Sequence, residues 1–330
     1  MKIRRIATQN LNNTVLAIVL VGVMLLLALV IGNRFFTLRN FSSMAGQIPE
    51  FGLLSLAIMA AMLTGGIDLS IVATANLSGI ATALVMTNFV TPDMSGVSVL
   101  LVVAVAITVG MLVAASCGAL NGVLITRVGI PAIIATLGTM ALYDGVGILI
   151  TSGRGIVGFP LPFQFLGNGS IGPVPMAFVI FAISVVVFAI ILNKTRFGKS
   201  IKMIGANPIA ARFAGLNISK VLLKVYIMNG ILAGISAMIM ISRSNSAKSG
   251  YGSSYLLQSI LIVVLGGTNP AGGFGSVSGV IMAIFILQFL GSGLNNLGFS
   301  PFAQEIIRGG MLLLVMVINF YTSRHAARKK

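Results

Sequence analysis

The sequence predicts an all-α polytopic membrane protein, and two observations support this fold class. Of the 330 residues, 57% are hydrophobic and 8% are charged, which is about a third of the charged fraction in soluble domains. Residues 97–126, 155–193 and 249–304 contain no charged side chain. A water-soluble core needs a polar shell that this chain lacks, so we expect a single transmembrane domain over residues 1–330.

The individual spans follow from the length of helix that a bilayer requires. A spanning helix needs about 20 mainly apolar residues, and we divide the apolar runs at Gly, Pro and polar clusters. The second, fifth and eighth spans contain Gly pairs or polar residues that also fit broken or re-entrant helices, so the expected number is eight to ten. The ten ranges are approximately 14–32, 44–64, 68–90, 97–119, 130–150, 175–193, 225–242, 254–268, 275–293 and 302–320.

The first span is expected to be retained in the mature protein. A secretory signal has an apolar stretch of about 7–15 residues that ends at a small-residue cleavage site. Residues 14–32 form a longer uncharged run, and no Ala-x-Ala-like site follows it.

The distribution of basic residues predicts that both termini are cytoplasmic. Cytoplasmic loops are enriched in Lys and Arg, and ten alternating helices with the N-terminus inside place most of the 21 basic residues on the inner side. The inner group is Lys2, Arg4, Arg5, Arg127, the basic residues of 194–224 and the tail from Arg324; the outer group is Arg34, Arg39, Arg154, Arg243 and Lys248.

Motifs for catalysis and nucleotide binding are weak in this sequence. The single His325 lies in the basic tail, and the single Cys117 excludes a Cys-built zinc site. Residues 153–158 fit G-x-G-x-x-G, but a Pro-containing loop follows instead of a helix. Residues 198–200 resemble the end of a P-loop whose first Gly is replaced by Asn193. We therefore expect no enzymatic activity and no cofactor on this chain.

Ionisable residues within the membrane are costly and invite a functional hypothesis. Asp68 lies in Gly65–Ser70 between two apolar runs, where it fits a translocation pathway or, as we favour, the N-cap of the following helix. Glu305 and Arg308 are spaced i, i+3, which predicts a structural ion pair on one helix face.

Uncharged amides are better candidates for a translocation pathway. They could hydrogen-bond a neutral hydroxylated solute, and the alternative is hydrogen bonding between helices. These residues are Asn76, Asn121, Gln258, Gln288, Asn295 and Asn296.

Pairs of Gly at i, i+4 predict close helix approach. The pairs are Gly118 with Gly122, Gly230 with Gly234, and Gly275 with Gly279.

The hydrophilic segment 194–224 predicts a short helix on the cytoplasmic side. Asn207-Pro208 can start a helix, residues 209–213 would form it, and Gly215 can end it. A basic loop near anionic lipid explains the charge, but a short capped helix favours docking into the groove of a partner protein. Ala211 is expected to face that groove.

Three blocks of sequence resemble the permease subunits of ATP-binding-cassette importers for monosaccharides of the ribose, arabinose and xylose type. The first is Gly65–Ser70 and the last comprises Gly266–Thr268 and Gly272–Gly279. Ile71-Val72 replaces the usual Val-Gly of the first block, and Leu216 replaces an Ile of the second. The second block consists of Thr195, Gly198, Ile201, Ile204, Gly205, Asn207, Ala210, Ala211, Gly215 and Leu216.

The resemblance implies a type II importer-like permease in the bacterial inner membrane. Two such permeases, identical or paralogous, would sit on two cytoplasmic ATP-binding subunits, and a soluble binding protein would deliver the sugar. The short helix would be the coupling helix that contacts the ATPase. The implied coupling residues are Gly205, Asn207, Ala210, Ala211, Arg212 and Gly215.

Two other functions remain open at this level. An ion-coupled secondary transporter would use helices broken at Gly65-Gly66 and Gly266-Gly267, although five acidic residues in the whole chain disfavour ion coupling. A membrane scaffold that only recruits an ATPase is the other alternative.

Overall fold

The computed structural model describes residues 2–32, 35–91 and 93–328, with side chains described from residue 13 to 317 within those ranges. Arg34 and the last two residues lie outside the described part, and the side chains of Lys2, Arg4, Arg5, Arg324 and His325 are likewise not described. The long helices are α1 (Lys2–Ile31), α2 (Leu38–Leu63), α3 (Ile71–Phe89), α4 (Gly96–Val123), α5 (Ala132–Thr151), α7 (Met176–Lys194), α10 (Ile218–Ser244), α12 (Val277–Asn296) and α13 (Pro301–Arg328).

Short elements connect these helices. A π-helical turn, η2 (Leu124–Val128), continues α4. The short helices are α6 (Leu161–Asn168), α8 (Arg196–Ala206), α9 (Pro208–Phe213) and α11 (Ser254–Leu265), and the strands are β1 (Ile156–Val157), β2 (Ser170–Ile171), β3 (Val174–Pro175) and β4 (Ser246–Ala247). Strand β1 pairs with β4, and β2 pairs with β3, both antiparallel.

The all-α polytopic prediction is confirmed. Within the described residues, eight helices are long and apolar enough to cross a membrane. Helix α11 has 12 residues, or about 18 Å at 1.5 Å per residue, which is too short for a hydrocarbon core of about 30 Å. The eighth predicted span is therefore a short helix that does not reach across the hydrocarbon core, whereas the second and fifth correspond to the continuous helices α2 and α5.

Hydroxyl side chains start several of the helices. At the start of α2, Thr37 Oγ1 accepts a hydrogen bond from the Asn40 amide at 3.2 Å. Ser95 caps α4 and Ser276 caps α12 in the same way. Each cap satisfies a backbone donor that would otherwise have no intrahelical partner.

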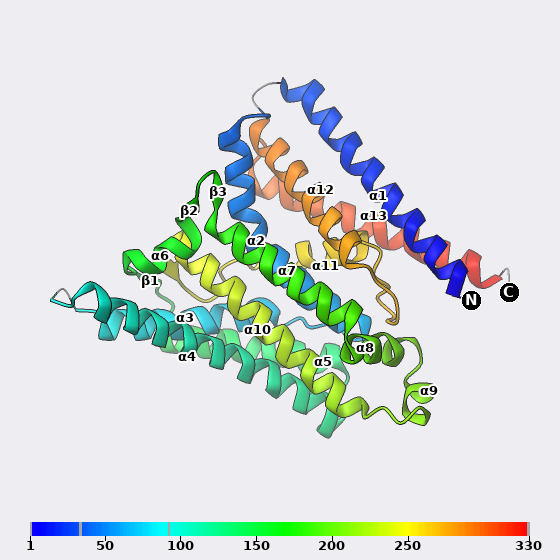
Figure 1. The fold of residues 1–330 in the computed structure, drawn as a ribbon, viewed down its shortest axis with the longest axis horizontal. Helices are drawn as coiled ribbons and strands as arrows, with labels where there is room; N and C mark the ends of the chain where they lie inside the picture. Colours follow the sequence, from blue (N-terminus) through cyan, green and yellow to red (C-terminus); the bar gives the residue numbers. More distant parts are fainter. Residues whose placement is uncertain (1, 33–34, 92, 329–330) are drawn as a thin grey trace.

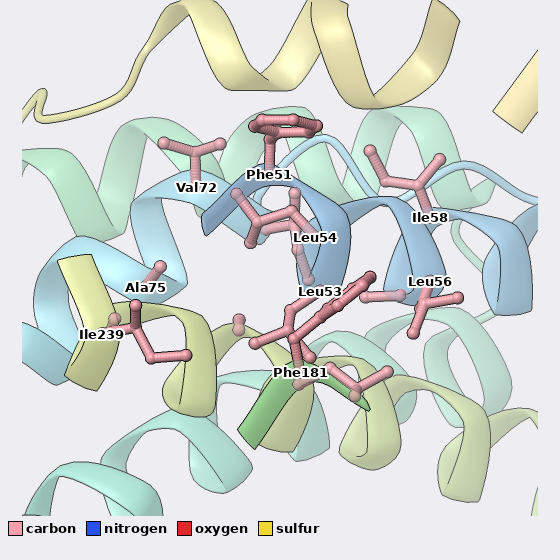
Figure 2. Packing of buried hydrophobic residues seen from close by; sticks show 14 of the residues in the cluster. Phe51, Leu53, Leu54, Leu56, Ile58, Val72, Ala75, Phe181 and Ile239 are labelled. Carbon is pink, nitrogen blue, oxygen red and sulfur yellow. The ribbon is translucent and has the colours of Figure 1, made fainter. Parts of the chain in front are cut away.

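Helix α2 lies at the centre of the molecule and is almost completely buried. It packs against α7, α10, α11 and α12. Small residues on the surface of α2 allow these helices to approach it closely. A Cβ on Gly52 would lie 2.6 Å from the Phe181 ring of α7. Figure 2 shows Phe51 and Phe181 on opposite sides of α2, so both faces of the helix are packed.

Helices α4 and α10 cross at the predicted Gly pairs. A Cβ on Gly118 would collide with the carbonyl oxygen of Tyr226, and one on Gly230 would collide with that of Ala114. Gly279 of α12 lies equally close to the carbonyl oxygen of Gly266. The three Gly pairs therefore do mark close helix contacts.

The two ends of the bundle differ in what they carry. In Figure 1 the N-terminal end of α1, the C-terminal end of α13, α8 and α9 lie at one end, and α6 with the short strands lies at the other. At the α6 end, the Gly167 amide donates to Ser242 Oγ (2.8 Å) and joins α6 to α10. This arrangement agrees with the predicted topology, in which both termini and residues 194–224 share the inner side.

Candidate functional site

The short helix predicted between residues 207 and 215 is present as α9. The Asn207 side chain accepts the Ala210 amide at 3.0 Å, Pro208 occupies the first helical position, and Gly215 follows the helix with a φ of +79°. This is the local structure that the sequence predicted.

The side chains of α9 are arranged differently from the expectation. Ala211, which was expected to face a partner, is 1% exposed and packs within the chain. The exposed large side chains are Ile209 (70%) and Phe213 (89%), which lie four residues apart on one helix face. Asn207, Ala210, Arg212 and Gly215 are also exposed. The exposed surface of α9 therefore carries an apolar patch of Ile209 and Phe213, with Arg212 as the basic residue of the helix.

Helix α8, which precedes α9, lies between the bundle and solvent. Lys202 is partly buried there, which lowers the pKa of its ammonium group. Its Nζ donates to Asn193 Oδ1 at 3.1 Å. Together with the Thr195 cap, whose hydroxyl accepts the Gly198 amide at 3.2 Å, this contact holds α8 against the end of α7.

The three sequence blocks meet near α8, at a contact that we call the glycine junction (Leu63, Gly65, Gly205, Gly272 and Gly273). The Gly273 amide donates to the Leu63 carbonyl oxygen at 3.0 Å. A Cβ on Gly205 would collide with that same oxygen and with the Gly273 amide. Gly65, Gly272 and Gly273 adopt φ values of +84°, +93° and +78°. Residues other than Gly rarely adopt positive φ values.

The glycine junction gives Gly205 a role inside the chain. It joins α8 to the end of α2 and to the loop between α11 and α12. Local sequence pattern did not predict this contact, because its three segments are far apart along the chain. A shallow depression of about 480 Å³ lies beside it, lined by Gly205, Ala206, Asn269 and residues 271–274.

Asp68 belongs to a buried polar network. The sequence favoured Asp68 as the N-cap of α3, and this prediction is wrong. The N-cap is Ser70. Asp68 Oδ1 accepts from the Ser70 amide (3.2 Å) and hydroxyl (2.7 Å), and Asp68 Oδ2 accepts from Asn229 Nδ2 (3.2 Å). Asn121 Nδ2 donates to Ser70 Oγ (2.7 Å), and Thr139 Oγ1 donates to Asn121 Oδ1 (2.6 Å). The network joins α3, α4, α5 and α10.

The predicted pathway residues therefore fall into separate groups. Asp68 and Asn121 hold helices together in the network, and Asn76 is buried on α3. Gln258, Gln288 and Asn295 line a cavity of about 370 Å³, while Asn296 donates to the Ser292 carbonyl oxygen of its own helix.

The cavity lies between α2, α11, α12 and α13. Most of its wall consists of amide and hydroxyl side chains, and the apolar contribution comes from Phe51, Leu287 and Pro301. Gln288 Nε2 donates to Gln47 Oε1 (3.2 Å), and Ser292 Oγ donates to Asn40 Oδ1 (2.9 Å). The complete lining is Asn40, Ser43, Gln47, Phe51, Ser254, Tyr255, Gln258, Leu287, Gln288, Gly291, Ser292, Asn295, Pro301, Gln304, Glu305 and Arg308.

The predicted ion pair between Glu305 and Arg308 is wrong. Both side chains line the cavity, but the ion pair within 4.0 Å in the described part of the chain joins Arg243 to Glu50. Arg308 instead extends across to α12, where its guanidinium lies beside Gly291. The helix spacing allowed the pair, but the two charged groups lie farther apart than an ion pair requires.

The Glu50–Arg243 pair was not anticipated from the sequence. Glu50 is 3% exposed and its partner is 193 positions away. A signal was available, because a carboxylate in an apolar helix requires a partner and the chain has five acidic residues. The partner itself could not be identified without the fold.

Comparison with known proteins agrees with this structure. A family model described as "Branched-chain amino acid transport system / permease component" matches residues 40–316. The autoinducer 2 import system permease proteins LsrD of Yersinia pestis (strain Pestoides F) and of Yersinia pseudotuberculosis (strain YPIII) are each 33% identical to this chain over 272 residues, which is 81% of this chain and 78% of the relative. No solved structure matches the chain.

The family match covers most of the chain and includes the glycine junction, the polar network and the cavity. The chain therefore belongs to this family, as a multi-pass inner-membrane permease component of a binding-protein-dependent ATP-binding-cassette importer whose ATP is hydrolysed on a separate subunit.

Proposed function

We propose that this permease carries a monosaccharide of pentose or hexose size, delivered from outside by a sugar-binding protein. The observation that carries the proposal is the wall of the 370 Å³ cavity, which is mostly amide and hydroxyl. Each sugar hydroxyl both donates and accepts hydrogen bonds, and so does each amide side chain. The volume is near the lower end of the 300–1,000 Å³ typical of small-molecule sites.

Two other solutes are suggested by the comparisons. The relatives are named for autoinducer 2, and the family description names branched-chain amino acids. An aliphatic side chain would need an apolar pocket, and Phe51, Leu287 and Pro301 are the apolar side chains of this wall. The small apolar part of this wall therefore disfavours a branched aliphatic side chain, and the uptake comparison below tests whether the charged Glu305 and Arg308 of the same wall bind an amino acid.

The proposal also includes coupling to ATP. Residues 194–224 form the coupling loop of a single membrane domain, and α9 enters a groove on the cytoplasmic ATP-binding subunit. Exposed Ile209 and Phe213 supply the apolar contact, and Arg212 adds charge at its edge. A second permease, a copy or a paralogue, completes the assembly on the two ATP-binding subunits.

The test is uptake by the complete importer in proteoliposomes. Radiolabelled D-ribose, L-arabinose, D-xylose and D-galactose are compared with autoinducer 2 and L-leucine, each with its cognate binding protein present and with or without ATP inside. We expect ATP-dependent uptake of at least one monosaccharide. Uptake of leucine alone, or of autoinducer 2 alone, would refute the monosaccharide assignment.

A further inference from the structure

Three side chains beside the cavity form a contact that the proposed function does not use. Glu50 of α2, Arg243 of α10 and Tyr255 of α11 meet in the protein interior. Arg243 Nη1 donates to Glu50 Oε1, and the Tyr255 hydroxyl donates to Glu50 Oε2 at 2.6 Å. Both carboxylate oxygens are therefore occupied, as a buried carboxylate requires.

The ring of Tyr255 forms part of the cavity wall. Phe51 lies beside it, with ring centroids 6.1 Å apart and ring planes inclined by 58°, and both residues line the cavity. In Figure 2 Phe51 projects from α2 away from Phe181 and the α7 side. Ser259 Oγ donates to the Phe51 carbonyl oxygen at 3.2 Å and fixes α11 against α2.

A cavity lined by both aromatic rings and amides suits the chemistry of a sugar. One face of a sugar ring presents C–H groups, which pack on an aromatic ring, and its edge presents hydroxyls. Gln258 follows Tyr255 by three positions on α11 and lines the same cavity. Small-molecule sites combine aromatic and apolar side chains with a few convergent polar groups, and amides are among those groups.

The ion pair also connects this wall to the coupling segment. Helix α10 has 27 residues, or about 40 Å at 1.5 Å per residue. It begins shortly after α9, and Arg243 lies in its last turn. Ser236 of α10 donates to the Glu50 carbonyl oxygen at 2.6 Å. Glu50 is thus held to α10 at two points.

We propose that Tyr255 contacts the transported solute and helps to determine its specificity, and that Glu50 and Arg243 are positioning residues that set the orientation of the Tyr255 ring. This inference rests on the proposed function, since it assigns a contact to the same cavity. It adds that the Glu50 carboxylate links α10 to the Tyr255 ring, because it accepts hydrogen bonds from both Arg243 and Tyr255.

The first experiment measures uptake per ATP hydrolysed in the complete reconstituted importer. The probe is the monosaccharide of the panel that the wild-type assembly takes up fastest. Tyr255→Leu is expected to lower this ratio about tenfold while ATP hydrolysis stays within about twofold of wild type. Tyr255→Phe, which keeps the ring and loses the bond to Glu50, is expected to give about a threefold loss.

Tyr251→Phe is the matched control. Tyr251 lies in the loop before α11, and the structure records no hydrogen bond from its hydroxyl in the described residues, so this variant should behave as wild type. Wild-type uptake of a panel sugar combined with unchanged Tyr255 variants would overturn the inference and leave the proposed function intact. Absence of uptake of every panel sugar by the wild type would instead refute the proposed function.

A second experiment separates positioning from a general structural role. Arg243→Gln is introduced into the wild type and into Tyr255→Leu. If Arg243 acts through the Tyr255 ring, Arg243→Gln lowers the uptake per ATP hydrolysed in the wild type. The same substitution has little further effect in Tyr255→Leu, where the ring is absent. Independent, additive losses would contradict the positioning role. Should Arg243→Gln fail to assemble, Glu50→Leu, which removes the acceptor of the Tyr255 hydroxyl, replaces it in the same cycle.

Discussion

Asp68 shows how a single buried acid can be structural in a transport protein. Its carboxylate accepts from the Ser70 amide, the Ser70 hydroxyl and Asn229 Nδ2. The Asn229 Oδ1 atom has no hydrogen-bond partner within the described residues. The side chain at position 68 must therefore accept hydrogen bonds from Ser70. An Asn side chain at position 68 could do so, and its amide could donate to Asn229 Oδ1 after rotation of the Asn229 side chain.

This geometry predicts different outcomes for two substitutions. Asp68→Asn keeps an acceptor for Ser70 and should change the free energy of unfolding by less than about 1 kcal/mol. Asp68→Leu leaves buried donors without acceptors and should lower it by about 1–3 kcal/mol per donor. Thermal unfolding of the purified permease in detergent measures both. A Leu variant as stable as the Asn variant would show that the network does not stabilise the fold.

At the scale of elements, the glycine junction joins α8 to the bundle. The contact is between backbones, so even one methyl group has no space. Gly205→Ala should lower the free energy of unfolding by about 1–3 kcal/mol and reduce ATP-dependent uptake. Gly138→Ala on α5 is the control, because a Cβ there meets no atom within 4 Å, and it should be neutral or stabilising by up to about 1 kcal/mol. Equal stability of the two variants, measured by thermal unfolding, would contradict the junction.

The surface of α9 predicts which substitutions separate docking from folding. Phe213→Asp adds a charge to an exposed apolar patch and should weaken the binding free energy for the ATP-binding subunit by about 2 kcal/mol or more. Less of that subunit should then copurify with the permease, while the thermal stability of the permease is unchanged. Lys220→Gln on the first turn of α10 is the control and should bind as wild type does. Ala211→Asp is expected to destabilise the segment itself, because Ala211 is buried. Undiminished copurification of Phe213→Asp would refute docking through α9.

The elements could be predicted to different degrees. Apolar length and charge placement located the helices, and Asn207, Pro208 and Gly215 located α9, because spans and caps are local features of the chain. The approach of Gly205 to Leu63 and Gly273, the pairing of Glu50 with Arg243, and the burial of Ala211 depend on packing between distant segments. No periodicity or motif in one sequence reports such contacts, so the candidate site was predicted in composition but not in geometry.

For the whole molecule, the topology determines whether the coupling segment can reach ATP. The end of the bundle that carries α8 and α9 also carries the ends of α1 and α13, and α6 with the short strands lies at the opposite end (Figure 1). Most basic residues were assigned to the α8 side, which is the side that cytoplasmic loops occupy. Residues 194–224 should therefore face the cytoplasm and Ser170 the outer side.

Labelling of single cysteines tests this orientation in intact cells. The native Cys117 is buried and is first replaced in Cys117→Ser, which must retain uptake. In that background Ser170→Cys, at an exposed position between α6 and α7, should react with a membrane-impermeant maleimide in intact cells. Lys199→Cys, at an exposed position on α8, should react only after lysis. The reverse pattern would place α9 outside, away from the ATP-binding subunits, and would refute both the topology and the coupling role that depends on it.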